Sequence, residues 1–352
     1  MNNELTINQH RIGAGQPVYI IAELSANHGQ NFDQAVHIIR AMKEAGADAV
    51  KVQTYTADTL TIPCDNEYFR IGGGTLWDGR TLHELYQQAY MPWEWTPKLM
   101  AIAQELGLDF FSTPFDFTAV DFLESLKVPA HKVASFELVD IPLLQKIAAT
   151  GKPIVASTGM ASLAEIQEAV DTMRQVGNTQ LALLKCTSAY PASPDEMNLR
   201  TLGDLAARFQ VPVGLSDHTL GIAVPIAAVS LGACIIEKHF TLSRAIPGPD
   251  SAFSLEPPEF KAMVQAIRVA EKALGRVSYE ISGNESKSRM FRRSLFVVED
   301  VQAGERFTET NVRSIRPGHG LHTRHLREVL GKRASQSISR GTPLSWDLIA
   351  KD

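Results

Sequence analysis

Cysteine is scarce in this sequence, with only three among 352 residues: Cys64, Cys186 and Cys234. Their odd number and wide spacing argue against a disulfide framework and favour reduced thiols in a cytoplasm. Long hydrophobic runs are missing too, since no apolar stretch approaches the roughly 18 residues of a membrane-spanning helix. Residues 1–13 are polar and lack the apolar centre of a signal peptide. We therefore expect a cytoplasmic protein with no membrane partner.

An excess of positive charge is also absent. Lys and Arg total 34 against 39 Asp and Glu, and this formal net charge of −5 gives no reason to expect nucleic acid as a partner. No Gly-x-Gly-x-x-Gly follows the first expected strand, which removes the main sign of a dinucleotide site. The length allows one large domain and one small one, and the ordinary composition fits a globular protein.

What the sequence does contain is a recurring helix stop. Amphipathic stretches end at Gly46, Gly107, Gly151 and Gly232, where glycine suits the left-handed position after a helix, and a short β-rich run follows at once. With the runs between these marks, eight strands are expected, each followed by a helix-length segment. The strands are Val18–Ala22, Ala49–Val52, Phe110–Phe111, Lys132–Ala134, Ile154–Ala156, Leu181–Leu184, Val213–Leu215 and Ile235–Ile236. The helices are Asp33–Ala45, Thr96–Leu106, Phe117–Leu126, Ile141–Thr150, Ser162–Gln175, Asn198–Phe209, Gly221–Leu231 and Pro257–Leu274.

Eight such units within about 275 residues have the size and order of a (β/α)8 TIM barrel, with an open doubly wound sheet as the alternative. We place the barrel in residues 1–276 and a polar linker in residues 277–290. Residues 291–352 contain short β-like runs, at 294–298 and 334–338, broken by turn sequences. A small β-rich domain of this kind is at the lower limit of independent stability, so we expect it to dock on something.

One connection is too long for its place. Residues 54–95 separate the second strand from its helix and include a glycine-rich stretch at 72–79 and a short helical pattern near 82–90. Long loops inside compact domains are usually functional, and a loop that follows a barrel strand lies on the face where active sites form. Its tryptophans, Trp77 among them, favour packing or ligand contact over a merely flexible surface.

Two histidines end the last two expected strands, in the strand–helix–strand unit 213–240. Because side chains alternate along a strand, Glu237 and His239 point the same way. Parallel strands bring both ends to one edge of the sheet, so His218 and His239 should be neighbours. This pattern indicates a divalent metal site, and two hydrogen-bonded structural histidines are an equal alternative. The apolar helix at 221–231 should lie buried against the sheet.

Polar side chains follow all eight expected strands and would meet at the mouth of the barrel. Lys51 and Lys132 are the most informative, because two ammonium groups in one pocket repel and lower each other's pKa. Their pairing favours a bound dianion such as phosphate, with hydroxyl groups completing the site. A surface position for either lysine and a Schiff-base lysine are the alternatives. Glu23 and Glu137 are candidate acid/base carboxylates, and singly each is more often a salt-bridge partner.

Eight short segments carry these polar residues in a fixed order. They are Ala-Glu23-Leu-Ser-Ala-Asn27-His28-Gly, Val-Lys51-Val-Gln53-Thr, Ser-Thr113-Pro-Phe-Asp, Lys132-Val-Ala-Ser135-Phe-Glu137, Ser157-Thr-Gly-Met, Gly-Leu-Ser216-Asp-His218-Thr, Glu-Lys-His239-Phe and Pro-Gly-Pro-Asp250. Each is weak alone, but all of them in this order resemble the sialic acid synthase family. Residues 291–352, with Arg316-Pro-Gly-His-Gly, resemble the antifreeze-like (SAF) domain of those enzymes.

The resemblance implies an enzyme that condenses phosphoenolpyruvate with an open-chain amino sugar and releases phosphate by C–O cleavage. In that family the positions of His218 and His239 hold a divalent metal, manganese or magnesium, with cobalt as a further candidate. Glu137 matches the general acid/base, and Arg316 matches an arginine that enters the partner subunit's site in a domain-swapped homodimer. The resemblance implies two groups of substrate contacts. Lys51, Lys132, Thr113, Ser135 and Ser157 surround the phosphate and carboxylate, with Ser188 and Tyr190 near the phosphate. Glu23 and Asp250 lie on the sugar side, and Gln53 and Ser216 are further substrate-binding residues.

The loop at residues 72–82 and the sequence Pro-Trp-Glu-Trp at 92–95 resemble the branch of the family that uses a diacetamido trideoxy sugar. For such a 6-deoxy acceptor, Leu76 or Trp77 is expected to face the methyl group. A synthase for sialic or legionaminic acid is the alternative within the same chemistry. A non-catalytic sugar- or phosphate-binding protein is a further alternative, and the paired acid/base and metal-binding residues argue against it.

Overall fold

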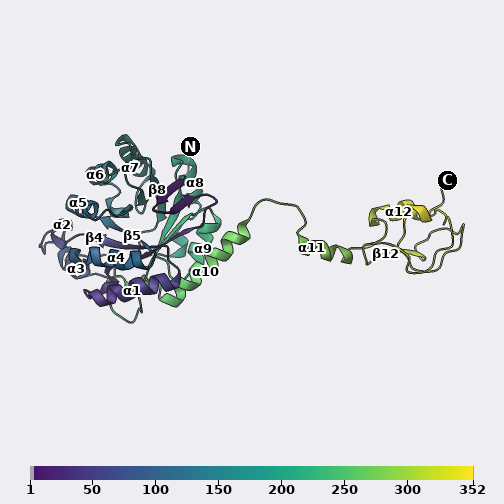
Figure 1. Ribbon diagram of the computed structural model, residues 1–352, viewed down its shortest axis with the longest axis horizontal. Helices are drawn as coiled ribbons and strands as arrows, with labels where there is room; N and C mark the ends of the chain where they lie inside the picture. The colour runs from purple at the N-terminus through teal and green to yellow at the C-terminus, as the bar shows by residue number, and fades with distance from the viewer. Residues whose placement is uncertain (1–3, 352) are drawn as a thin grey trace. The chain divides into compact units, whose positions relative to one another are not determined.

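The computed structural model describes residues 4–351, and its larger part is a closed barrel of eight parallel strands (Figure 1). The strands are hydrogen-bonded in the order β10-β3-β4-β5-β6-β7-β8-β9. Their bounds are β3 Tyr19–Glu23, β4 Ala49–Thr54, β5 Asp109–Pro114, β6 His131–Val133, β7 Ile154–Ser157, β8 Leu181–Cys186, β9 Val213–Asp217 and β10 Ile235–His239. All eight predicted strands are present, and most extend further into the polar residues at their C-terminal ends. The (β/α)8 fold is confirmed.

Helices connect the strands along the outside of the barrel (Figure 1). They are α1 Phe32–Ala45, α4 Thr96–Glu105, α5 Phe117–Ser125, α6 Ile141–Ala149, α7 Leu163–Gln175, α8 Thr201–Phe209, α9 Ala223–Ser230 and α10 Pro257–Leu274. Helix α1 shows how the sequence sets their limits. The Asn31 side chain accepts a hydrogen bond from the Gln34 N–H at 3.0 Å, and Gly46 ends the helix with a φ of 93°.

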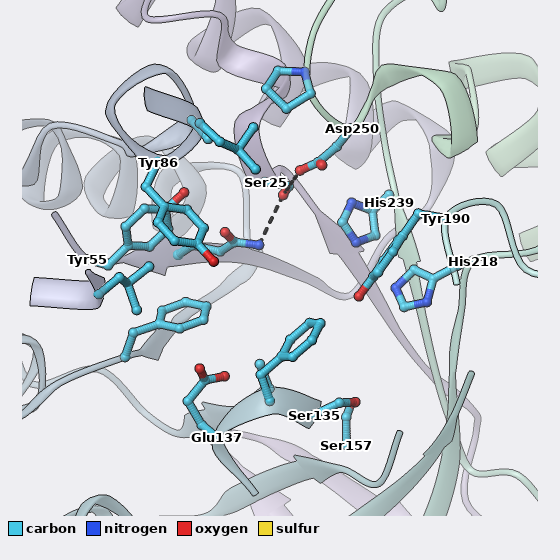
Figure 2. A pocket seen from close by; sticks show the side chains of 18 of the residues that line it. Ser25, Tyr55, Tyr86, Ser135, Glu137, Ser157, Tyr190, His218, His239 and Asp250 are labelled. Atoms are coloured by element: carbon cyan, nitrogen blue, oxygen red, sulfur yellow. Dashed lines mark hydrogen bonds between the residues drawn. The ribbon is translucent and has the colours of Figure 1, made fainter. Parts of the chain in front are cut away.

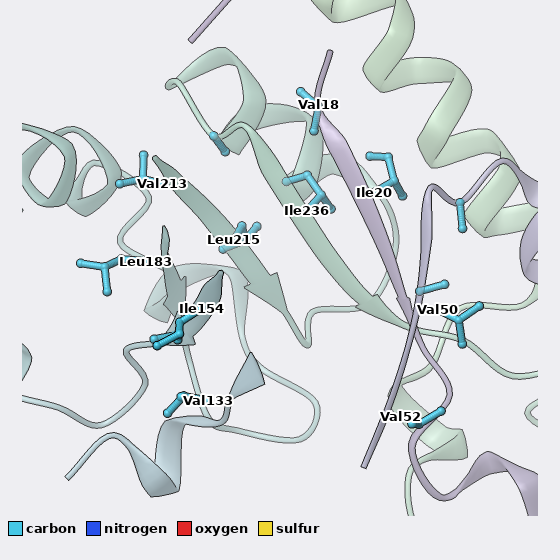
Figure 3. Close-up of a cluster of buried hydrophobic side chains, with 14 of the residues drawn as sticks. Val18, Ile20, Val50, Val52, Val133, Ile154, Leu183, Val213, Leu215 and Ile236 are labelled. Carbon is cyan, nitrogen blue, oxygen red and sulfur yellow. The ribbon is translucent and has the colours of Figure 1, made fainter. Parts of the chain in front are cut away.

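Apolar side chains pack on both sides of the barrel wall. Outward-facing residues such as Ile20, Val50 and Ile236 form the core between strands and helices (Figure 3). Inward-facing residues such as Tyr19 and Phe111 fill the barrel itself. The alternation follows from the two-residue period of a strand.

A hairpin that the sequence pattern did not predict lies at the N-terminal end of the barrel. It consists of β1 (Glu4–Ile7) and β2 (His10–Gly13), which pair antiparallel. Leu5, Ile7 and Ile12 belong to the inner cluster, and Asn8 donates a hydrogen bond to Asp109, the first residue of β5, at 2.6 Å. The hairpin therefore packs against the starts of the strands, and the opposite end of the barrel carries the polar side chains.

Helix α9 is buried on one face. Pro225, Ala228 and Val229 are buried, whereas Leu231, directly after the helix, is 46% exposed. The burial expected for this helix holds for the side that packs on the barrel.

The chain divides between Gly275 and Arg276 into two compact units. In the second unit, β11 (Ser294–Val297) pairs antiparallel with β12 (Val312–Ile315), and helix α12 spans Leu326–Val329. This unit has its own apolar core, which is formed by Leu295, Val297, Val301, Phe307, Val312, Val329, Ala334, Ile338, Leu344 and Ile349.

Two details of the second unit differ from expectation. The predicted run 334–338 forms no strand but makes single bridges, from Ala334 to Ile349 and from Ile338 to Val301. Helix α11 (Gly283–Ser288) lies within the segment for which a linker was expected. No helix within residues 4–351 has the length and apolar character to cross a membrane.

Candidate active site

A cavity of about 440 Å³ lies at the C-terminal ends of the barrel strands (Figure 2). Most residues predicted for the site line it, namely Lys51, Gln53, Lys132, Ser135, Glu137, Ser157, Tyr190, Ser216, His218, His239 and Asp250. Glu23 and Thr113 are buried beneath its surface, and Ser188 lies beside it. Arg316 belongs to the second unit. The barrel thus brings together residues that are far apart in the sequence.

Two lysines and two glutamates form the floor of this cavity. Nζ of Lys51 lies 2.5 Å from Oε2 of Glu23 and 3.6 Å from Oε1 of Glu237. Nζ of Lys132 lies 3.9 Å from the same oxygen of Glu237 and donates a hydrogen bond to Ser157 Oγ at 2.7 Å. None of the four charged side chains is more than 5% exposed. Since buried charges are tolerated only when they are paired, the four groups stabilise one another.

The expectation that both lysines have a lowered pKa is wrong for Lys51. Burial lowers that pKa, but Glu23 and Glu237 outweigh burial and raise the pKa of Lys51 above its ordinary value. For Lys132, burial lowers the pKa and Glu237 offsets only part of the effect. Glu237 had no assigned role in the sequence analysis. Its shared side with His239 was the available signal, and the structure places its carboxylate between the two lysines.

Hydroxyl groups surround the charged floor. Thr113 Oγ1 accepts a hydrogen bond from Lys51 Nζ at 3.4 Å, and Ser216 Oγ donates one to Glu237 Oε1 at 3.1 Å. A cavity with two ammonium groups and several hydroxyls can bind the oxygens of a phosphate and a carboxylate.

A glycine makes room for two of these hydroxyls. The Gly159 N–H donates a hydrogen bond to Ser135 Oγ at 3.1 Å. A Cβ at this position would collide with Ser188 Oγ and stand 2.7 Å from Ser135 Oγ. Ser188 itself contacts Cys186, whose sulfur lies 3.8 Å from its hydroxyl. Ser188 therefore supports the wall at Gly159 and Cys186 and does not line the cavity.

Glu137 stands at the edge of the charged floor, on the 3₁₀ turn Ser135–Glu137 that follows β6. Burial raises the pKa of its carboxyl to about 7, and within residues 4–351 its Oε2 atom has no hydrogen-bond partner. A carboxyl with a pKa near neutrality and a free oxygen aimed at a cavity suits general acid/base catalysis. The acid/base role of Glu137 stays a prediction, with this geometry as its physical basis.

Glu23 is a different kind of carboxylate, because it is fully buried and already paired. It accepts hydrogen bonds from the Ser25 N–H at 3.0 Å and from Gln53 Nε2 at 3.2 Å, in addition to its contact with Lys51. Ser25 Oγ in turn donates a hydrogen bond to Asp250 (Figure 2). These contacts make Glu23 a residue that positions Lys51 and Gln53, and of the two carboxylates expected on the sugar side only Asp250 lines the cavity.

His218 and His239 lie side by side on the cavity wall, with ring centroids 5.3 Å apart. His218 Nδ1 lies 3.1 Å from the Thr187 carbonyl oxygen, which fixes the ring, and His239 Nδ1 is buried without a partner among residues 4–351. Burial, reinforced by His218 and the nearby lysines, holds the pKa of His239 well below its usual range. A neutral imidazole with a free nitrogen can bind a metal ion. In the described part of the chain, no third His, Cys, Asp or Glu is placed to join them.

Residues 38–279 match the model of the NeuB family, and residues 292–350 match that of the SAF domain. The chain belongs to the NeuB family. The resemblance found in the sequence is thereby confirmed, as is the presence of a SAF domain in the tail.

Relatives of this NeuB-family chain are similar over nearly its whole length. Pseudaminic acid synthase of Helicobacter pylori is 47% identical over 337 residues, which cover 96% of this chain and 99% of that protein. N,N'-diacetyllegionaminic acid synthase of Legionella pneumophila is 40% identical over 96% of each chain.

Solved structures show the same fold. The N-acetylneuraminic acid synthetase of Leptospira borgpetersenii, in complex with citrate, has a TM-score of 0.73 at 32% identity and covers 81% of this chain and 94% of that one. The spore coat polysaccharide biosynthesis protein SpsE of Bacillus subtilis has a TM-score of 0.68 at 36% identity over 99% of each chain.

The NeuB-family cavity has a second side, which is lined by apolar and aromatic residues. We call this side the apolar wall, and it consists of Tyr55, Leu60, Ile71, Leu82, Tyr86 and Phe115. Helices α2 (Ala57–Leu60) and α3 (Leu82–Ala89) carry part of it. In Figure 2 the tyrosines lie across the cavity from the two histidines. Sequence analysis predicted a functional loop here but not these side chains.

The two residues expected to face an acceptor methyl group behave differently. Trp77 lines the cavity, and its indole N–H donates a hydrogen bond to the Pro249 carbonyl at 3.1 Å. Its ring centroid lies 5.7 Å from that of Tyr190. Leu76 is 51% exposed and does not line the cavity, so of the two alternatives only Trp77 is placed to contact a bound sugar.

Proposed function

We propose that this chain is a pseudaminic acid synthase. Phosphoenolpyruvate would condense with the open-chain form of 2,4-diacetamido-2,4,6-trideoxy-β-L-altropyranose and with water, giving pseudaminic acid and phosphate. The carrying observation is that one cavity combines a lysine-rich floor, an acid/base carboxyl and two neighbouring histidines. The acceptor follows from the 47% identity to the pseudaminic acid synthase, against 40% to the legionaminic acid synthase.

Phosphoenolpyruvate fits the charged floor. Its phosphate and carboxylate need several hydrogen-bond donors and positive charge, which Lys51, Lys132 and the hydroxyls of Ser135 and Ser157 supply. Glu237 balances the lysines before the substrate arrives. We infer that the entering anion competes with this carboxylate for the two ammonium groups.

The bond changes of this reaction require a base that takes a proton from water, and we assign this role to Glu137. The methylene carbon of phosphoenolpyruvate attacks the sugar aldehyde, and the new C–C bond leaves a cationic C2. Water adds to C2 and gives one proton to a base and the other to the alkoxide that the aldehyde oxygen has become; the C2–O bond to phosphate then breaks and leaves a carbonyl at C2. A carboxyl whose pKa is about 7 can accept that proton at neutral pH and return it to the departing group.

We place the aldehyde group of the sugar beside the two histidines. His218 and His239 would hold a divalent metal, manganese or magnesium, with cobalt as a further candidate, and leave coordination positions for substrate oxygens. When bound, such an ion polarises the carbonyl group for attack. Asp250 and Gln53 line the same cavity and would bind sugar hydroxyls.

The tail unit has a role in this proposal as part of a domain-swapped homodimer. Arg316 is exposed directly after β12, on a loop tied down by the hydrogen bond from Ser294 Oγ to the Pro317 carbonyl oxygen at 2.6 Å. The loops at the C-terminal ends of the barrel strands carry exposed apolar residues, with Phe136 57%, Met160 61% and Leu220 58% exposed. A protein surface that covers this rim would remove it from water.

We propose the cytoplasm as the compartment, because all three cysteines are free and phosphoenolpyruvate is a metabolite of that compartment. The reaction class can be tested with phosphoenolpyruvate carrying ¹⁸O at the bridging oxygen. C–O cleavage transfers the label to the released phosphate, whereas P–O cleavage leaves it on the sugar acid. Stoichiometric binding without any phosphate release would favour the sugar- or phosphate-binding protein instead.

A further inference from the structure

The apolar wall takes no part in the chemistry described above. The phosphate, metal and acid/base groups all belong to the strand ends, whereas Leu60, Ile71 and Leu82 come from the insertion between β4 and α4. An apolar surface of this extent inside an active-site cavity is expected to bury an apolar part of a substrate.

Two tyrosines make this wall more than a hydrophobic surface. Tyr55 and Tyr86 pack edge to face, with centroids 5.8 Å apart and an interplanar angle of 76°, and Tyr55 packs in the same way on Phe115. Both tyrosines line the cavity. Within residues 4–351 neither hydroxyl is hydrogen-bonded to a protein group. Burial, with Glu137 across the cavity, raises the pKa of Tyr86, so its hydroxyl stays a neutral hydrogen-bond donor.

A single methyl group does not match this surface. It would cover apolar carbons but would leave both hydroxyls desolvated and unpaired, which is costly in a buried site. An N-acyl group matches it better, because its carbonyl oxygen accepts a hydrogen bond from a tyrosine while its methyl end contacts the aliphatic side chains.

We propose that the apolar wall binds one of the two N-acyl groups of the acceptor sugar. The Tyr86 hydroxyl donates a hydrogen bond to the acyl carbonyl oxygen, and Leu60, Ile71 and Leu82 enclose the acyl methyl group. This subsite rests on the proposed function, since the proposed acceptor carries the two N-acyl groups of which the wall binds one. It makes the insertion at residues 54–95 a determinant of acceptor choice.

The test uses the full-length protein with manganese and three acceptors. These are the diacetamido trideoxy altrose and two analogues in which one acetyl group, at N2 or at N4, is replaced by propionyl. Wild-type kcat/KM should fall about 10-fold for one analogue, because one extra methylene is worth at least that much in a closed apolar pocket. Leu82→Ala should restore kcat/KM for that analogue and leave kcat/KM for the other analogue unchanged. Tyr86→Phe should raise KM for the acceptors about 5-fold to 10-fold and leave KM for phosphoenolpyruvate unchanged, as expected for one lost neutral hydrogen bond.

Tyr68→Phe is the matched control, because Tyr68 lies in the same insertion, is 81% exposed and does not line the cavity. The proposal is overturned if Leu82→Ala changes kcat/KM equally for both propionyl analogues, or changes it for neither of them. A fourth acceptor with a 6-hydroxyl group tests the methyl group separately: if the variants change only the preference between 6-deoxy and 6-hydroxy acceptors, the wall binds the methyl group and the proposal is overturned. No turnover by the wild type with any of the three acceptors would contradict the proposed function and, with it, this subsite. Turnover of all three with no response to either variant would contradict the subsite alone.

Discussion

Oε1 of Glu237 lies 3.9 Å from Nζ of Lys132, and both side chains are buried. The same oxygen is 3.6 Å from Nζ of Lys51. The place where two lysines would bind a dianion is therefore bordered by a carboxylate of the protein. The negative charge of this carboxylate compensates the positive charges of the two lysines in the absence of substrate.

Glu237→Gln should lower the free energy of unfolding by about 3 kcal/mol in phosphate-free buffer, because it leaves two buried ammonium groups with one fewer counterion. Inorganic phosphate should restore part of this loss in the variant, since the dianion takes the place of the carboxylate. Chemical unfolding with and without phosphate measures both effects. Glu67→Gln, at an exposed position, is the control. An equal loss at all phosphate concentrations would show that phosphate does not bind between the lysines.

Glu137→Gln should reduce kcat about 10²-fold to 10⁴-fold, the usual contribution of one general acid/base. Because the pKa of Glu137 is about 7, the wild-type kcat should change with pH around neutrality, and the variant should lack that limb of the profile. A variant that keeps both its rate and its pH profile would remove Glu137 from the mechanism.

The same substitution has a predictable effect on stability. The pKa of Glu137 is about 7 in the folded protein against an ordinary value of 4.5 in the unfolded chain, so the folded state favours the protonated form. Wild-type stability from this group is fully present below pH 4.5 and is lost as the pH rises through 7. Glu137→Gln should therefore become more stable than the wild type by up to about 3 kcal/mol above pH 7 and show no such gain below pH 4.5. Unfolding curves across this range give the difference.

Gly159→Ala should raise KM for phosphoenolpyruvate by about 10-fold or more, because a Cβ there would displace the Ser135 hydroxyl. Its metal affinity should be unchanged. Gly203→Ala is a suitable control, since a Cβ at this helical position meets no atom within 4 Å. Steady-state kinetics at varied phosphoenolpyruvate concentration measures KM for the wild type and both variants. An unchanged KM would mean that Ser135 does not contact this substrate.

The swapped dimer makes a prediction about mixed subunits. Arg316→Ala and His239→Ala should each abolish most turnover, and Arg316→Ala should still bind metal. When the two variants are co-expressed, a hybrid dimer has one site with an intact barrel and an intact arginine from the other chain, so activity should partly return. If each tail completes the site of its own chain, every site in the hybrid is defective and no activity returns.

Much of the barrel was predictable because four amphipathic stretches end at Gly46, Gly107, Gly151 and Gly232 and because each strand is followed by polar residues. The pairing of His218 with His239 followed from the parallel order of the last two strands, which brings their ends to one edge of the sheet. The orientation of Glu237 followed from strand alternation, but its position between two lysines depends on side chains of strands far away in the sequence. The β1–β2 hairpin was not predicted because a four-residue strand is too short to show a clear hydrophobic periodicity.

The conformation of the insertion at residues 54–95 could not be predicted from sequence patterns. Asp78 accepts hydrogen bonds from the N–H groups of Gly74 and Thr75, both at 2.8 Å, and folds the loop into a tight turn. This turn places Trp77 in the cavity and leaves Leu76 exposed. Neither the turn nor the orientation of helix α3 has a periodic signal, so the apolar wall could not be predicted residue by residue.

The most direct test of the account is phosphate release from phosphoenolpyruvate in the presence of manganese. The acceptors to compare are 2,4-diacetamido-2,4,6-trideoxy-altrose, N-acetylmannosamine and the hexose precursor of legionaminic acid. We predict release with the first acceptor and little with the other two. Release with N-acetylmannosamine or the legionaminate precursor alone would contradict the pseudaminic acid assignment.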